Sequence, residues 1–408
     1  MFINRRVSMV SNYQYVVVGG GAAGITFTSQ LLRQRPESQV VIVDPAEFHY
    51  YQPAWTLCGG AGWNVEATKR RESECIPKGA NWIQDHVESF IPESNQVTLK
   101  SGNILEYEIL IVAPGIQLDW NKIEGMSREL VGENGICSVF TPDGAKRTWE
   151  MINEFEGGNA IFTQPQPPIK CGGAPQKIMY LTAERFKERG ISEKSQISFC
   201  LPGKTPFGIK EFVPLLTEVL DRNSIKRNYG HILTRVDPEK KIATFVINRE
   251  EEGEKLVDMR YELLHVVPPQ SAPDFVKTSP LADAHGWLDV NKHTLQHKIY
   301  KNVFGIGDAT STPNAKTAAA VRKQVPVVIE NICDFKDNQH LSGKYSGYAS
   351  CPLITGKGKV VLAEFDYDGK LMPSFPLNPA KERYSMWLLK TKFLPFLYWN
   401  IMLKGINL

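Results

Sequence analysis

Apolar and polar residues are arranged between residues 13 and 44 in a way that predicts a strand, a helix and a second strand. The run Tyr15 to Val18 is short and rich in β-branched residues, which is typical of a strand buried in a parallel sheet. A helical pattern follows from about residue 22 to 35, and the apolar run Val40 to Val43 predicts the next strand. This order predicts a βαβ unit and therefore an α/β fold.

The same reasoning extends along the chain. It predicts strands at residues 80–87, 97–99, 106–112, 159–163, 197–201 and 303–306, helices at 143–156 and 176–189, and a helix start near 316. Between residues 132 and 159 the composition shifts toward loops and a charged helix, so we place a first domain boundary there. The charged stretch 249–255 predicts a hairpin tip exposed to solvent.

A glycine fingerprint joins the first predicted strand to its helix. Gly19, Gly21 and Gly24 satisfy G-x-G-x-x-G, and Asp44 follows the second strand twenty residues after Gly24. The glycines allow a tight turn, close approach of the backbone to a pyrophosphate, and close packing of helix on strand, while the carboxylate can accept hydrogen bonds from a ribose. The context favours a dinucleotide site over a glycine-rich turn that binds nothing.

Two later stretches favour FAD over NAD. Asp308 ends a predicted strand and a helix begins just after Lys316, an arrangement that suits a polyol hydroxyl and a flavin carbonyl. The small-residue turn ending in Gly115 also permits close approach to a cofactor. A second glycine fingerprint, which an NAD-binding domain needs, is missing after the strand at 197–201, where residues 202–208 contain two prolines.

Seven cysteines are scattered along the chain without a C-x-x-C motif, so they predict neither a disulfide framework nor a zinc site. The eight histidines form no cluster, and we expect no metal. Cys171 is the candidate nucleophile, because it precedes a predicted helix and Lys170 and Lys177 add positive charge that favours a thiolate. The alternative, a small inert residue in the core, stays open.

Composition excludes other classes of function. The 408 residues carry a formal net charge of +3, too small to indicate nucleic-acid binding. The sequence contains no uninterrupted run of eighteen apolar residues, so we expect no membrane-spanning helix. Arg5 and Arg6, with no acidic residue before Glu37, resemble the end of a mitochondrial presequence, and an ordinary ragged N-terminus is the alternative.

The last stretch, from Tyr384 to Leu408, mixes large aromatic and aliphatic residues with lysines. Pro395 and Asn400 interrupt it, while Lys390, Lys392 and Lys404 could face anionic headgroups. This pattern predicts an amphipathic helix that lies in the plane of a membrane surface. A helix packed on the protein's own core, or at the interface of a homodimer, is the alternative.

Taken together, these features resemble the sulfide:quinone oxidoreductases of the eukaryotic mitochondrial type. The matching stretches span nearly the whole chain and are 18–24, 51–56, 170–181, 304–321, 350–353, 363–367 and 393–400. The resemblance implies two Rossmann-like domains of the glutathione reductase type plus the membrane-docking segment. We expect an FAD-binding domain in two parts, 12–134 and 271–333, a degenerate NAD-type domain at 135–270, and a C-terminal redox and docking region at 334–408.

The resemblance also implies chemistry and partners. Cys171 and Cys351 would form a redox pair that oxidises hydrogen sulfide, and electrons would pass through FAD to ubiquinone while sulfane sulfur moves to glutathione, sulfite or cyanide. The protein would lie on the inner mitochondrial membrane, expected on the matrix side. The residues expected to hold FAD are Gly19, Gly21, Ala22, Ala23, Gly24, Asp44, Gln52, Val87, Gly115, Asp308, Lys316 and Ala318.

The chain departs from the family pattern at two points. Asp44 stands where the relatives carry glutamate, and Ala22-Ala23 replaces a more usual Ser-Gly, and neither change threatens FAD binding. Cys137 is left out of the redox site. A type II NADH:quinone reductase, and a flavoprotein that acts only as a binding or assembly factor, remain as alternative functions.

Overall fold

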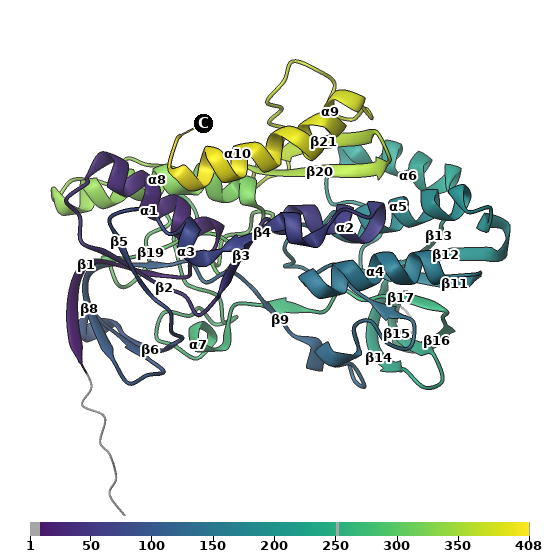
Figure 1. The fold of residues 1–408 in the computed structure, drawn as a ribbon, viewed down its shortest axis with the longest axis horizontal. Coiled ribbons are helices and arrows are strands. Elements are labelled where there is room, and N and C mark those ends of the chain that lie inside the picture. Colours follow the sequence, from purple (N-terminus) through teal and green to yellow (C-terminus); the bar gives the residue numbers. More distant parts are fainter. Residues whose placement is uncertain (1–8, 250–252, 408) are drawn as a thin grey trace, which may run out of the picture.

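The computed structural model describes residues 9–249 and 253–407, so the presequence-like arginines and part of the charged hairpin tip lie outside the described residues. Two sheets lie side by side along the long axis of the molecule, and the last part of the chain crosses both (Figure 1). The first sheet takes its strands from residues 10–112 and 303–305, and the second from residues 136–265. The α/β class is as predicted, while the exact domain boundaries stay a prediction.

The first sheet has the strand order β5-β2-β1-β8-β7-β6, with β19 also paired to β8. Its strands are β1 (Val10–Val18), β2 (Val40–Val43), β5 (Ala80–Ile83), β6 (Val87–Ile91), β7 (Gln96–Leu99), β8 (Ile104–Val112) and β19 (Val303–Gly305). The strand predicted at 80–87 is too long, because β5 ends at Ile83 and the chain turns before β6 begins at Val87. The turn is held by Asp85, whose carboxylate accepts hydrogen bonds from the backbone N–H groups of His86 and Ser101.

The register of the first sheet brings three loops to one edge. Val18 lies opposite Val112, and Val112 opposite Gly305, all in parallel pairing. The loops that follow β1, β8 and β19 therefore emerge together, where open α/β sheets bind ligands. The helices α1 (Ala22–Gln34) and α8 (Ala318–Lys336) pack against each other (Figure 1).

The second sheet has the order β10-β17-β11-β12-β13. Its strands are β10 (Ile136–Cys137), β11 (Gly158–Thr163), β12 (Ser195–Leu201), β13 (Lys226–Tyr229) and β17 (Leu263–His265), its helices are α4 (Pro142–Glu154), α5 (Ala174–Glu188) and α6 (Val213–Arg222), and an antiparallel sheet of β14 (His231–Asp237), β15 (Ile242–Arg249) and β16 (Gly253–Arg260) adjoins it.

The strand order corrects the predicted position of the loop that would carry a second glycine fingerprint. A Rossmann unit carries its phosphate loop after its central first strand. Here that strand is β11, which is followed by α5 and then by its parallel neighbour β12. The equivalent loop is therefore residues 164–173 and not 202–208. It carries no G-x-G-x-x-G, and it contains Cys171.

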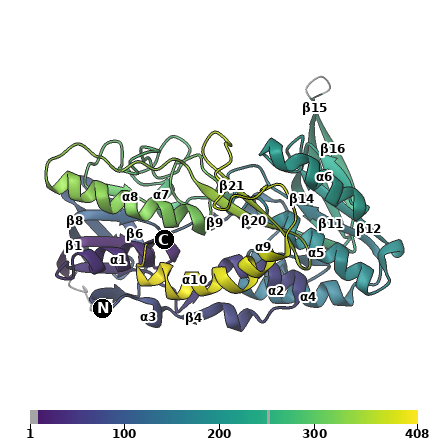
Figure 2. The same cartoon turned by 90° about the horizontal axis from the view of Figure 1, so that it is seen from above.

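The C-terminal part adds a hairpin, β20 (Ala349–Gly356) and β21 (Lys359–Phe365), and a tail. The tail comprises α9 (Tyr384–Leu388), a π-helical segment Leu389–Phe393, α10 (Leu394–Asn400) and a 3₁₀ turn Met402–Lys404. Seen from above, it runs from the hairpin toward α1 (Figure 2). Within residues 9–249 and 253–407, no helix has the length and apolar character to cross a bilayer.

One face of the tail is buried, as the alternative reading of its sequence proposed. Tyr398, Trp399 and Leu403 are buried in the same cluster as the residues of α1, and Ser29 donates a hydrogen bond to the carbonyl of Leu403 at 2.7 Å. The opposite face exposes large side chains, with Phe393 at 59% and Phe396 at 56% of their surface. The tail is therefore amphipathic with its inner face on the protein itself.

The remaining short elements connect these units. They are β3 (Phe48–Tyr50), α2 (Trp55–Ala61), β4 (Lys69–Arg71), α3 (Glu72–Cys75), β9 (Gln117–Leu118), β18 (Gln270–Ser271) and α7 (Asp274–Lys277).

Candidate redox site and cofactor-binding loops

The fold brings Cys171 and Cys351 together although 180 residues separate them, with their sulfur atoms 3.6 Å apart. Cys171 has a φ of +52°, a left-handed conformation that few non-glycine residues adopt. Its backbone N–H donates to the carbonyl of Lys316 at 2.9 Å, which ties the cysteine loop to the loop before α8. Cys351 is buried on β20.

The close approach of the two cysteines depends on Gly173. A Cβ atom at this position would lie 2.2 Å from Leu353 Cδ2 and 2.7 Å from Cys351 Sγ, closer than van der Waals contact permits. The backbone N–H of Gly173 also points at Cys351 and lowers the pKa of that thiol in part. The helix start thus interacts with Cys351, while Cys171 lies just before it.

The surroundings favour a thiolate at Cys171 and a thiol at Cys351. Hydrogen bonding from Cys351 and the charge of Lys177 hold the pKa of Cys171 well below its usual value, and Lys177 Nζ lies 3.0 Å from Cys171 Sγ. The Cys171 thiolate and burial raise the pKa of Cys351 well above its usual value. Burial opposes the charge of Lys177, yet the two cysteines raise its pKa. Lys177 therefore plays the part expected from the sequence.

Lys170 points elsewhere. Its Nζ donates to Gln52 Oε1 at 2.6 Å, and burial lowers the pKa of its ammonium group despite the attraction of Asp308. Lys170 thus interacts with two residues that the resemblance places at the cofactor, by a hydrogen bond to Gln52 and by charge with Asp308.

Lys390 is a site residue that the sequence interpretation missed. It was assigned to anionic headgroups, but it is 2% exposed and its Nζ donates to the carbonyl of Pro53 at 2.8 Å. Burial, assisted by the charge of Lys177, lowers the pKa of Lys390 to about 7. A signal was present, because Lys390 lies four residues after Met386 and eight before Tyr398, on the buried stripe of the tail.

The loop after β1 has the shape that a pyrophosphate requires. At Gly19, with φ +103°, a Cβ would lie 2.4 Å from the carbonyl oxygen of Ala113, and at Gly24 it would lie 1.9 Å from that of Gly19. At Gly21 no atom lies within 4 Å of the Cβ position, so the loop opens there toward free space. The three glycines fit a bound dinucleotide, and Ala22 and Ala23 begin α1 directly after them.

The other predicted cofactor residues lie around the same edge. Asp44 directly follows β2, and its carboxylate accepts a hydrogen bond from the backbone N–H of Gly20 at 2.6 Å. Asp308 follows β19, and burial raises the pKa of its carboxyl group against the charge of Lys316. Burial lowers the pKa of Lys316 to about 8, and its Nζ donates to the carbonyl of Thr310 at 2.8 Å.

Three further predicted residues are also placed. Ala318 is the first residue of α8, capped by the Thr317 side chain, which accepts from the N–H of Ala320. Gly115 follows β8 with φ +77° and open space at its Cβ position. Val87 begins β6 and packs in the same apolar cluster as the ends of β1, β2 and β8.

Comparison with known proteins identifies the family. Residues 13–150 match the family described as pyridine nucleotide-disulphide oxidoreductase. Over 395 residues the chain is 44% identical to the mitochondrial sulfide:quinone oxidoreductase of Mus musculus, and the match covers 97% of this chain and 87% of that relative. The chain belongs to the sulfide:quinone oxidoreductase family. It is thus an FAD-dependent oxidoreductase, as the resemblance implied.

Solved structures share the fold at low identity. The sulfide:quinone oxidoreductase from Aquifex aeolicus superposes with a TM-score of 0.78 at 20% identity, covering 98% of this chain and 92% of that chain. A chain in the Tetrahymena thermophila mitochondrial ATP synthase superposes with a TM-score of 0.83 at 19% identity, covering 98% and 97%. These two matches concern the fold alone.

In this sulfide:quinone oxidoreductase family member, four other cysteines are buried away from the pair. Burial raises the pKa of Cys58, Cys137 and Cys200 to about 12 and that of Cys75 to about 11, so these groups stay thiols at neutral pH. Their environment is that of packing residues.

The aromatic stretch that follows Asp44 contacts the tail. Tyr51 is buried with its ring centroid 4.9 Å from that of Tyr398, so aromatic packing anchors this loop to the tail. His49, which the sequence did not single out, lies between Gly20 and Tyr398. Its Nδ1 lies 3.2 Å from the carbonyl oxygen of Gly20, and its Nε2 lies 2.6 Å from Tyr398 Oη. The phosphate loop and the tail are therefore joined through one histidine.

Proposed function

We propose that this chain oxidises hydrogen sulfide at the Cys171–Cys351 pair and delivers two electrons through FAD to ubiquinone. The observation that carries the proposal is the pair itself. The two sulfur atoms lie 3.6 Å apart, and Lys177 Nζ lies 3.0 Å from Cys171 Sγ. The family membership and the glycine loop at the same site support it.

The unequal pKa values of the two thiols set the direction of attack. A thiol of low pKa is the better leaving group in exchange at a sulfur bridge. Hydrosulfide therefore attacks Cys351 Sγ, the bridge bond breaks, and Cys171 leaves with the electron pair as a thiolate beside Lys177. The product is a persulfide on Cys351.

The bridge must then be restored. The terminal sulfur of the persulfide passes to a small nucleophile, for which glutathione, sulfite and cyanide are the proposed acceptors, and Cys351 is released as a thiolate. With sulfide alone, a second hydrosulfide takes this sulfur in the same way and leaves as hydrogen disulfide anion. The two thiolates form the bridge again as two electrons leave them. FAD supplies the two-electron acceptor that passes these electrons on to quinone.

We propose that the chain holds FAD with the residues gathered at the edge of the first sheet. The amides of Gly19 to Gly24 and the start of α1 would bind the pyrophosphate. Asp44 would accept from the ribose, and Lys316 and the start of α8 at Ala318 would lie at the flavin. Gln52, Val87, Gly115 and Asp308 would complete the lining.

A mass measurement tests the assignment of the persulfide. The bridged protein is mixed anaerobically with one equivalent of sulfide, alkylated and digested. We expect the added 32-Da sulfur on the peptide containing Cys351, since sulfur addition is set by the leaving group. Sulfur found mainly on Cys171 would contradict the proposed direction of attack.

The two alternatives differ in observable ways. A type II NADH:quinone reductase needs a dinucleotide loop after β11, where this chain has Cys171. A flavoprotein that serves only in assembly could share the fold, since a chain found in a mitochondrial ATP synthase has this fold. Such a protein would not need a lysine 3.0 Å from one of two adjacent cysteines.

Removal of Lys390 is expected to change the pH dependence of stability. Its pKa falls from 10.5 to about 7 on folding, so between these values the unfolded chain binds more protons and stability rises with pH. From pH 7 to pH 9 the free energy of unfolding of the wild type should gain on the order of 2 kcal/mol from this group. Urea unfolding at both pH values measures the gain.

The matched control for this prediction is the exposed neighbour Lys392. Lys390→Met should lose the gain, whereas Lys392→Met should keep it. Equal gains in the wild type and Lys390→Met would refute the low pKa.

We further propose a mitochondrial protein that docks peripherally on the inner membrane, at its matrix face, through the outer face of the tail. The name of the mouse relative supports the mitochondrial location. Tyr384, Leu388, Phe393 and Phe396 are exposed on the tail, and aromatic side chains of this kind suit the headgroup region.

The double variant Phe393→Ser/Phe396→Ser is expected to weaken binding to liposomes containing cardiolipin by at least about tenfold, because two buried aromatics contribute several kcal/mol. Co-sedimentation measures it. Deleting the tail is a poorer test, since its inner face covers the core. The control is Leu256→Ser/Ile299→Ser, which removes equally exposed apolar residues elsewhere. Binding that is unchanged in the first variant would contradict docking by the tail.

A further inference from the structure

The hairpin that carries Cys351 is held by neither of the two large sheets. Among the strands of the described residues, β20 and β21 pair only with each other. Neighbouring elements must therefore fix the position of the hairpin. β20 packs along α5, with Cys351 and Leu353 beside Gly173 at the start of that helix.

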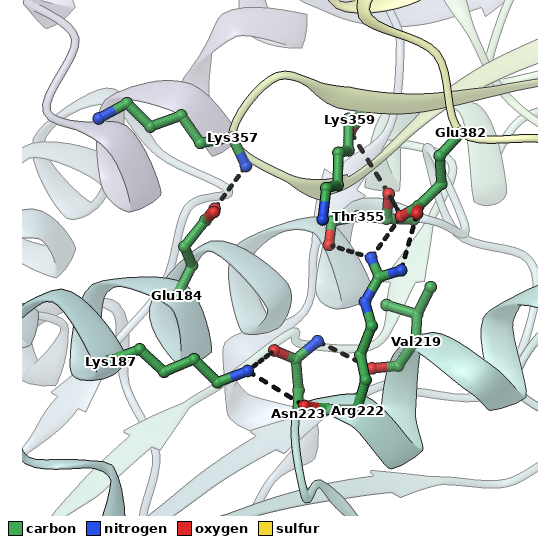
Figure 3. Close-up of polar contacts among 9 residues, drawn as sticks. All are labelled: Glu184, Lys187, Val219, Arg222, Asn223, Thr355, Lys357, Lys359 and Glu382. Atoms are coloured by element: carbon green, nitrogen blue, oxygen red, sulfur yellow. Dashed lines mark hydrogen bonds and ion pairs between the residues drawn. The ribbon is translucent and has the colours of Figure 1, made fainter.

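β20 makes a second attachment near its other end. Thr355 lies four residues after Cys351, where the pairing of β20 with β21 becomes irregular between Ile354 and Gly356. Thr355 Oγ1 donates to the carboxylate of Glu382, and its carbonyl accepts from Arg222 Nη2 at 3.4 Å. Figure 3 shows these side chains converging between the hairpin and the end of α6.

Arg222 and Glu382 form the centre of this cluster. The guanidinium donates through both terminal nitrogens to the two oxygens of Glu382, with Nη1 at 2.7 Å from Oε2. The side chains are 29% and 17% exposed, so solvent screens the pair only in part. Burial opposes the effect, but Arg222 and Thr355 hold the pKa of Glu382 below its usual value. A forked pair of this kind has a fixed geometry.

Side chains of α5 hold both the end of α6 and the end of the hairpin strand β20. Lys187 on α5 donates to the carbonyl of Arg222 at 3.1 Å and to Asn223 Oδ1 at 2.8 Å, and Glu184 accepts from the backbone N–H of Lys357 (Figure 3). α5 thus contacts the ends of both α6 and β20. The helix that starts beside Cys171 serves as the common support.

Glu382 also lies directly before the first helix of the tail. The next residue, Arg383, exchanges backbone hydrogen bonds with Val360 of β21, and α9 begins at Tyr384. The tail then carries Lys390 into the site. One carboxylate is therefore placed between the strand that holds Cys351 and the segment that holds Lys390.

We propose that Arg222 and Glu382 are positioning residues that fix the register of β20 on α5 and so hold Cys351 opposite Cys171. They act at a distance, because Thr355 lies four residues from Cys351, about 13 Å along the strand. Small displacements at a reacting pair are costly to the rate. The inference rests on the proposed redox role of the two cysteines.

Arg222→Gln and Glu382→Gln test the proposal, because each removes one charge of the fork. In each variant, the rate of flavin reduction by sulfide should be about ten- to a hundredfold lower than in the wild type. Stopped flow measures this rate, and the FAD content should be unchanged. The charge-swapped variant Arg222→Glu/Glu382→Arg should recover most of the rate. The control is Arg227→Gln, which breaks the ion pair with Asp221 at the end of α6 and leaves the hairpin contacts in place.

A second measurement is independent of sulfide. The fully reduced protein is treated with the thiol oxidant diamide, and the rate at which Cys171 and Cys351 become bridged is followed by mass spectrometry. The single variants should form the bridge about ten- to a hundredfold more slowly, and the swapped variant near the wild-type rate. Wild-type bridging in the single variants, or no recovery in the swap, would overturn the proposal. A wild type that bridges normally but is not reduced by sulfide would instead count against the proposed function.

Discussion

Replacement of either Cys171 or Cys351 with serine is expected to slow flavin reduction by sulfide at least about a thousandfold, because no bridge is left for hydrosulfide to attack. Serine is slightly smaller than cysteine and has the same shape, so it introduces no clash in the packing around Gly173. The measurement is anaerobic stopped flow with FAD-loaded protein. Equal losses in the two variants are expected, since the two sulfur atoms act as one unit.

The controls for this prediction are Cys137→Ser and Cys200→Ser. Both thiols are buried, and the pKa of each is raised to about 12, so neither supplies a thiolate at neutral pH. Both variants should be reduced by sulfide at nearly the wild-type rate once their FAD content is matched. A fast Cys171→Ser or Cys351→Ser enzyme would remove the basis of the proposed mechanism.

Gly21→Glu is expected to abolish FAD binding without unfolding the chain. No atom lies within 4 Å of the Cβ position, so the backbone tolerates a side chain, but the carboxylate would extend into the anion site of the loop. Like charges brought together at an interface cost several kcal/mol, or more than about a hundredfold in affinity. Absorbance of the flavin released on denaturation gives the FAD content per chain.

Gly208→Glu is the matched control, because its Cβ position is equally open and it lies in the loop after β12. This variant should retain FAD. Flavin retained by Gly21→Glu at the wild-type level would mean that the loop after β1 does not hold the pyrophosphate.

Local patterns were enough to predict the parts of the fold that depend on local interactions. The βαβ unit, the glycine loop and the helices α4 and α5 lie where periodicity and turn residues predicted them. The resemblance added Cys351 as the partner of Cys171, and the structure brings the two together.

The rest depends on tertiary contacts that a sequence does not display. Lys390 was read as a surface charge because lysine is rarely buried, but the tail packs on the protein and carries it to Pro53. His49 joins the phosphate loop to Tyr398 across 349 residues, which no local pattern encodes. The loop equivalent to a second fingerprint was misplaced by one βα unit, since strand order is a property of the sheet.

Electrons should enter this protein at the cysteine pair and not from a nicotinamide. The most direct test mixes the FAD-loaded protein anaerobically with sulfide in one syringe and with NADH in a parallel experiment, and follows bleaching of the flavin absorbance. We expect rapid bleaching by sulfide and none by NADH on the same timescale. Bleaching by NADH with no response to sulfide would contradict this expectation.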